Sequence, residues 1–172
     1  MTPVPVNALV VFSSRLGEAE AVGVAAGLGA LQGRASIRLR RFEGGAHVGD
    51  APGRDARAHA ERLIRDYIEP RAIDAEWAEL LVVVAPEGSP GGVDTYLASL
   101  ATVGSMKGKL AVPLAADARA ETVATLSVAA AQAGFTVMPA PTGTRDVRDT
   151  ARLHARELTG VVQATKTRGK KG

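Results

Sequence analysis

Short runs of aliphatic and β-branched residues recur along the chain, and five of them have the length and composition of strands. They cover residues 6–12, 35–42, 80–85, 109–116 and 135–140. The third run, LLVVVA, has no polar position, which predicts a strand covered on both faces. The second run alternates apolar residues with arginines, which predicts a strand near a sheet edge. Pro113 lies inside the fourth run and weakens that prediction or places a bulge there.

The segments between these runs have helical character, and most of them are rich in alanine. The predicted helices cover residues 17–31, 55–68, 93–102, 118–134 and 146–162, with a helical turn at 75–79. Pro70 ends the helix predicted over residues 55–68, and Gly134 caps the helix predicted over residues 118–134. Alternation of strands and helices predicts an α/β domain, a doubly wound five-stranded parallel sheet with helices on both faces. We expect a single domain over residues 1–164 and a flexible basic tail over 165–172.

The composition narrows the class of protein further. The chain has 172 residues, of which 46% are hydrophobic, so it can build a core. Its net charge of +3 owes much to the four basic residues of the tail, and the remainder is near neutral, so we expect no nucleic-acid partner. The absence of cysteine excludes disulfides, thiol catalysis and cysteine metal sites. No apolar run approaches the roughly 18 residues that span a bilayer, so we expect a cytoplasmic protein with no membrane partner.

The predicted sheet also indicates where a ligand would bind. Sheets of this class hold ligands at the carboxyl ends of their strands, near the point where the strand order reverses. Three loops leave those ends, at residues 13–18, 86–92 and 115–119. No metal-ligand spacing and no catalytic side chain can be recognised in them.

Several segments carry a resemblance to a known family. The segments "ALVVFSS", "WAELLVVVAP", "MKGKLAV" and "RDTARLHARELTGVV" resemble flavodoxin-like proteins over about residues 6–162. Within that group the chain is most similar to NAD(P)H:quinone oxidoreductases of the tryptophan-repressor-binding-protein type and to NADPH-dependent FMN reductases. The resemblance implies the strand order 2-1-3-4-5, an FMN cofactor, and NAD(P)H as co-substrate. It also implies a quinone or similar small-molecule electron acceptor and a homo-oligomer.

The resemblance assigns the first loop to the FMN phosphate. The family loop reads approximately S-x-T-G-N-T-E, and the corresponding residues are Ser14, Arg15, Leu16, Gly17, Glu18, Ala19 and Glu20. Ser14, Gly17 and Glu20 agree with the pattern. Leu16 and Ala19 replace hydroxyl residues and Glu18 replaces an amide, so the backbone N–H groups carry most of the expected binding.

The other two loops are assigned to the flavin ring. Pro86, Glu87, Gly88 and Ser89 match a family loop that reads S-P-T-Y or T-P-T-R, and of these Pro86 agrees. The third loop consists of Ala115, Ala116 and Asp117, where the family tends to have hydroxyls.

An acid therefore occurs in each of the three loops, and two interpretations follow. In the first, the chain is an FMN-binding oxidoreductase, and Glu18 and Glu20 only favour the dipole of the helix that they begin. In the second, the fold has lost FMN and serves as an interaction module or binds another ligand. A hydrolase ranks third, because no nucleophile-elbow motif is present.

The remaining polar residues have structural interpretations. His47, His59 and His154 show no ligand spacing and are expected at the surface. Trp77 is expected to pack against the sheet, away from the ligand loops. The basic segment RLRR at 38–41 is expected to form a solvated strand face.

Overall fold

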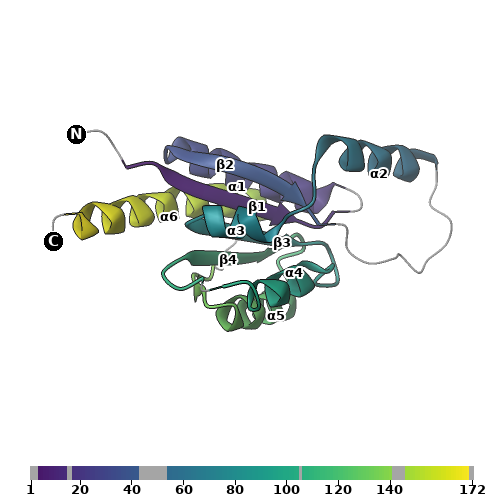
Figure 1. Cartoon of the computed structure of the whole chain (residues 1–172). Coiled ribbons are helices and arrows are strands. Elements are labelled where there is room, and N and C mark those ends of the chain that lie inside the picture. Colours follow the sequence, from purple (N-terminus) through teal and green to yellow (C-terminus); the bar gives the residue numbers. More distant parts are fainter. Residues whose placement is uncertain (1–3, 15–16, 43–53, 105, 141–145, 171–172) are drawn as a thin grey trace.

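The chain folds around one parallel sheet in the order β2-β1-β3-β4-β5, which confirms the predicted fold class (Figure 1). The computed structural model describes residues 4–14, 17–42, 54–104, 106–140 and 146–170. Its strands are β1 (Val6–Phe12), β2 (Ala35–Arg41), β3 (Leu80–Ala85), β4 (Leu110–Ala115) and β5 (Thr136–Val137). As the arginine-rich alternation predicted, β2 lies at an edge of this sheet.

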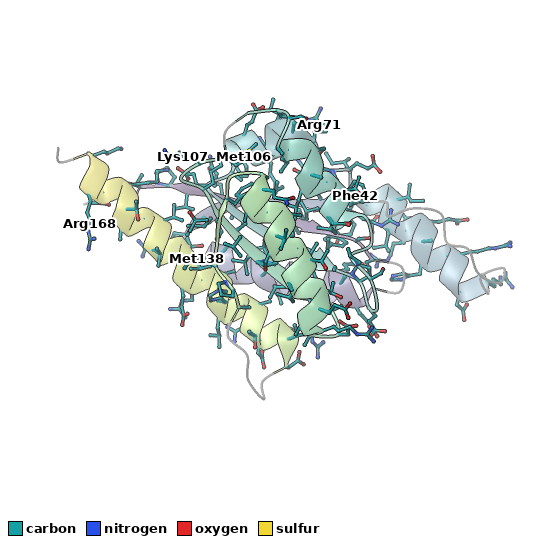
Figure 2. The ribbon with its side chains drawn as sticks, turned by 90° about the horizontal axis from the view of Figure 1, so that it is seen from below. Phe42, Arg71, Met106, Lys107, Met138 and Arg168 are labelled. Carbon is teal, nitrogen blue, oxygen red and sulfur yellow. The ribbon has the colours of Figure 1, made fainter. Side chains whose placement is uncertain are left out.

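Helices cover both faces of the sheet. They are α1 (Glu18–Gln32), α2 (Arg54–Asp66), α3 (Ala72–Trp77), α4 (Val93–Leu100), α5 (Ala120–Gln132) and α6 (Val147–Gly169). Buried residues of α1 and α6 pack on one face, and those of α3, α4 and α5 pack on the other. Helix α2 lies past the carboxyl ends of the strands in both views (Figure 1, Figure 2), and its Leu63 is buried in the core cluster of the α1 and α6 face.

The central strands form the core, as their apolar runs predicted. Every residue of β3 is buried, and the side chains of Val11 and Val83 are fully buried. These two residues are paired across β1 and β3 and face the α3–α5 layer. Within the described residues, no helix is both long enough and apolar enough to cross a membrane.

Pro113 is accommodated without a bulge, because β4 pairs with β3 in continuous register from Leu110 to Ala115. The carbonyl of Ala111 accepts a hydrogen bond from Met138 of the β5 segment, so odd-numbered positions of β4 direct their backbone groups toward that side. Strand β5 pairs only with Leu110 and Ala111. The backbone nitrogen of Pro113 therefore points to the β5 side of β4, but past the last residue that pairs with β5. No hydrogen bond of the sheet is lost there for want of an N–H.

Strand β5 is shorter than predicted, with two residues instead of six. Phe135 does not join the strand, because its N–H donates to the carbonyl of Ala130 at the end of α5. Gly134, with a positive φ of 101°, donates its N–H to the carbonyl of Ala131. This is the glycine cap that the sequence predicted. Pro139 has no N–H with which to continue the strand.

Helix α6 extends further than predicted, from Val147 to Gly169 instead of ending at Val162. Residues 165–169, assigned to a flexible tail, are therefore helical, and Arg168 lies near the end of this helix (Figure 2). The reason is a docking contact: Lys166 Nζ donates to the carbonyl of Pro5 at 2.7 Å and forms an ion pair with Glu79.

Candidate functional site

The three predicted ligand loops meet at the carboxyl ends of β1, β3 and β4, where the strand order reverses between β1 and β3. Ser13 and Ser14 follow β1 directly, and both are buried. Ser14 Oγ accepts a hydrogen bond from the N–H of Gly17 at 2.9 Å, which ties the end of β1 to the start of α1. Arg15 and Leu16 lie outside the described residues.

This hydrogen bond holds the N-terminus of α1 at the edge of the sheet. Gly17 occupies the N-cap position in a left-handed conformation with φ 94°, and no described side chain caps the helix. The first intrahelical bond runs from the N–H of Ala21 to the carbonyl of Gly17. The N–H groups of the first turn, including those of Glu18 and Ala19, thus have no intrahelical acceptor and can bind an anion.

The second loop, residues 86–92, folds back onto the end of β1. A Cβ on Gly91 would lie 2.4 Å from Pro86 Cδ and 2.9 Å from Ser13 Oγ, so this contact needs glycine. Gly88 has a φ of 78° and open space beside it. The backbone of this loop is therefore accessible at Gly88 and fixed at Gly91.

Asp117 joins the third loop to the second. Its Oδ2 accepts the N–H of Gly88 at 2.9 Å, and its Oδ1 accepts the N–H of Arg119 at 3.1 Å. Burial opposes ionisation of this carboxyl, but these two N–H donors and the Arg119 charge hold its pKa below the usual range. The N–H of Ala116 continues the ladder to Ala85. Asp117 therefore positions the loop that was assigned to the flavin ring.

Glu18 and Glu87 form an acidic pair at the mouth of the site. Both side chains are exposed. A hydrogen bond and the charge of Glu18 raise the pKa of Glu87, and the charge of Asp117 adds to this effect. The acids recognised one per loop in the sequence thus converge on one edge of the sheet, where Glu18 and Asp117 disfavour the charged form of Glu87.

Glu20 points away from the loops and toward α2. Its carboxylate accepts Arg62 Nη2 at 2.6 Å and the hydroxyl of Tyr67 at 3.1 Å. Burial and the charge of Glu20 raise the pKa of Tyr67 to about 12. Glu20 therefore holds the segment that contains α2 against the start of α1, besides favouring the helix dipole.

A groove of about 550 Å³ lies beside this ion pair, and no pattern in the sequence indicates it. We call it the α1–α2 groove; its lining residues are Gly17, Glu20, Ala21, Val24, Ala25, Leu28, His59, Arg62 and Arg148. The ring of His59 lies 3.0 Å from where a Cβ on Gly17 would be. His59 Nε2 is buried and has no hydrogen-bond partner among the described residues.

Two predictions for polar residues outside the loops are wrong. His154 is buried in α6 and His59 is partly buried, whereas both were expected at the surface; His47 lies outside the described residues. The side chains of Arg38 and Arg40 are not simply solvated, because both bind Asp74, which is fully buried.

Trp77, at the end of α3, packs against the core on this side of the sheet, as predicted, and the guanidinium of Arg38 lies 4.1 Å above its ring. The described residues contain no cluster of three side chains that could hold a metal ion.

No protein-family model and no curated protein matches the sequence. Solved structures do match. The chain is similar to a diflavin flavoprotein from Nostoc sp., with a TM-score of 0.61 and 14% identity over 98% of this chain and 99% of that one. It is also similar to a flavodoxin-like domain from Synechococcus sp., with a TM-score of 0.58 and 12% identity over 90% and 97%. For a Bacillus cereus flavodoxin the values are 0.51 and 13%, over 93% and 99%. At these identities the likeness establishes the flavodoxin-like fold.

Proposed function

We propose that this protein binds FMN at the carboxyl edge of its sheet and passes electrons from NAD(P)H to a quinone or similar small-molecule acceptor. The observation that carries the proposal is the start of α1. Its first turn, which no described side chain caps, lies with the buried Ser13 and Ser14 where the strand order reverses. This donor set suits a phosphate, because helix N–H groups and hydroxyls bind such an anion without requiring a cationic side chain.

Different residues of the loops hold different parts of the cofactor. The first-turn N–H groups of α1 bind the phosphate, and the Ser14 hydroxyl can still donate, because its oxygen accepts from Gly17. The backbone of residues 86–89 supports the ring, and Asp117 keeps that backbone in place through Gly88. When bound, the flavin ring supplies the redox chemistry, so the protein needs no catalytic side chain of its own.

The acidic pair of Glu18 and Glu87 acts against phosphate binding. Both carboxylates are exposed, so water and salt weaken their repulsion of the anion. We therefore expect an FMN affinity that improves with salt, up to the concentration at which salt also screens the favourable helix terminus.

A second candidate function rests on the same acidic pair. In this alternative the fold no longer binds FMN, and the edge of the sheet takes a less anionic ligand or contacts another protein. The favouring observation is that Glu18 and Glu87 converge where a phosphate would lie.

A flavin titration distinguishes the two functions. Quenching of FMN fluorescence is measured for the parent, for Glu18→Asn and for Glu121→Gln, a matched control that removes an exposed acid from the first turn of α5. Saturable quenching by the parent, tightened severalfold in Glu18→Asn and unchanged in the control, supports the proposal. Absence of quenching in all three proteins supports the alternative.

Two further assays test the finer parts of the proposal. Oxidation of NADH or NADPH with a quinone acceptor, followed at saturating FMN, tests the electron transfer. Sedimentation at several protein concentrations tests the homo-oligomer that the resemblance implies.

A further inference from the structure

The α1–α2 groove is built from three elements that are distant in the sequence. Residues of α1 form its floor, His59 and Arg62 of α2 form one wall, and Arg148 enters from the first turn of α6. Its volume of about 550 Å³ lies within the range of small-molecule sites, roughly 300–1,000 Å³. The groove is thus large enough for more than a single ion.

The floor and the walls of the groove differ in chemistry. The floor is apolar, with Val24, Ala25 and Leu28 on the outer face of α1, and the Leu28 side chain is exposed. The walls provide two guanidinium groups and one imidazole against a single carboxylate, Glu20. This arrangement suits a ligand with a flat apolar part and a negatively charged part.

The charges at the walls are only partly satisfied within the protein. Arg62 pairs with Glu20 and more weakly with Asp66 at 3.4 Å. Arg148 pairs with Asp146 at 2.9 Å, but its side chain remains 61% exposed. Each guanidinium has five N–H donors, so both retain donors for a phosphate.

The groove is continuous with the proposed phosphate site, because Gly17 belongs to both. From Gly17 the floor follows α1 to Leu28, and eleven helical residues span about 16 Å. A ligand whose phosphate is held at the start of α1 could therefore continue along the groove.

We propose that the α1–α2 groove binds the adenosine diphosphate part of a dinucleotide, with Arg62 and Arg148 on the pyrophosphate and the purine on the apolar floor. This inference rests on the proposed redox function and deepens it. The adenosine diphosphate can come from two sources, a flavin dinucleotide whose flavin lies at the strand ends, or the nicotinamide co-substrate.

Calorimetric titration with ADP tests the site directly and does not require a flavin. The variants are Arg148→Gln, which removes a wall charge, and Ala25→Phe, which fills the floor at a partly exposed position. Arg65→Gln is the matched control, because Arg65 lies on α2 with its side chain 73% exposed and does not line the groove.

Loss of a charged hydrogen bond predicts at least tenfold weaker ADP binding in Arg148→Gln, an undetectable signal in Ala25→Phe, and parent affinity in the control. A parent that binds no ADP, or groove variants that bind it as the parent does, would overturn the inference. Melting curves confirm that each variant is folded.

Parallel titrations with FMN, FAD and NADPH identify the source. Tighter binding of FAD than of FMN, by tenfold or more and abolished in Ala25→Phe, assigns the groove to the flavin dinucleotide. Equal affinities for the two flavins, with NADPH binding lost in Ala25→Phe, assign it to the nicotinamide cofactor. If FMN binds and ADP does not, the groove inference fails alone; if ADP binds and FMN does not, the proposed function fails alone.

Discussion

Replacing Asp74 with alanine tests how the edge of the sheet is held. Asp74 lies in α3 with its side chain fully buried. Its carboxylate accepts Arg38 Nη1 at 3.0 Å, Arg40 Nη2 at 3.2 Å and the backbone N–H of Arg71 at 3.0 Å. The substitution removes the carboxylate that both arginines bind and leaves them without this partner.

The expected loss of unfolding free energy depends on how well Arg38 and Arg40 are solvated once Asp74 is gone. Removing one partner of a buried ion pair typically costs about 3–5 kcal/mol. Arg38 and Arg40 keep 34% and 16% of their side-chain surface exposed and can partly regain water, which places the expected loss near the lower end, about 3 kcal/mol. For a domain of this length each kcal/mol lowers Tm by about 2–4 °C, so a decrease of about 6–12 °C is expected.

Thermal and urea unfolding of the parent, Asp74→Ala and Asp66→Ala measure this loss. Asp66 is the control because its ion pairs are exposed and contribute at most about 1 kcal/mol. If Asp74→Ala melts within 2 °C of the parent, the cluster does not hold α3 to β2 and the reasoning is refuted.

The pH dependence gives a second measurement on Asp74. Burial opposes its ionisation, but the N–H of Arg71 and the two arginines outweigh burial and hold its pKa below the usual value. Its stabilisation is therefore complete above the unfolded pKa of about 4 and is lost as the pH falls through the lower folded pKa. The parent should lose stability below pH 4 more steeply than Asp74→Ala does.

Three further predictions concern other parts of the molecule. Gly29→Ala should cost about 3 kcal/mol or more in urea unfolding, because its Cβ would lie 1.9 Å from the Arg152 carbonyl oxygen, whereas Gly160→Ala, in open space on α6, should be neutral or stabilising. Lys109→Met should cost about 1–3 kcal/mol in the same assay, because Lys109 Nζ donates to the carbonyls of residues 75, 76 and 78 at the end of α3, and a cost below 0.5 kcal/mol would contradict that role. Because Glu18 raises the pKa of Glu87, the pair loses a negative charge at a higher pH than an ordinary glutamate would, so lowering the pH should favour FMN binding to the parent more than to Glu87→Gln; equal effects would contradict the pairing.

The sequence predicted those parts of the fold that depend on local patterns. The apolar runs located β1, β3 and β4, and the arginine alternation placed β2 at an edge. The end of α6 could not be predicted in this way, because it depends on contacts between distant residues. The Lys166 contacts with Pro5 and Glu79, which join residues far apart in the chain, have no signature in either local sequence.

The candidate site likewise has features that the sequence could predict and features that depend on contacts between distant residues. That three loops meet at one edge follows from the parallel sheet, so their residues could be chosen from the sequence. The role of each residue in the site could be learned only from the structure. Asp117 was expected to contact the ligand, but it accepts a hydrogen bond from Gly88, 29 residues away in the chain, and so links two loops. The basic segment at 38–41 was misinterpreted for a similar reason, since its acidic partner, Asp74, lies in a later helix.

The position of α2 connects the site with the groove. The pairs of Glu20 with Arg62 and of Phe12 with Tyr67, whose ring centroids are 4.8 Å apart, hold this helix past the end of the sheet. His59 and Arg62 thereby lie beside the start of α1. Because Glu20 is occupied in this way, its charge is largely neutralised near the phosphate site, and the repulsion falls to Glu18 and Glu87 at the exposed mouth. The first turn of α1 can therefore remain an anion site although it carries two glutamates, since only one of them faces the loops.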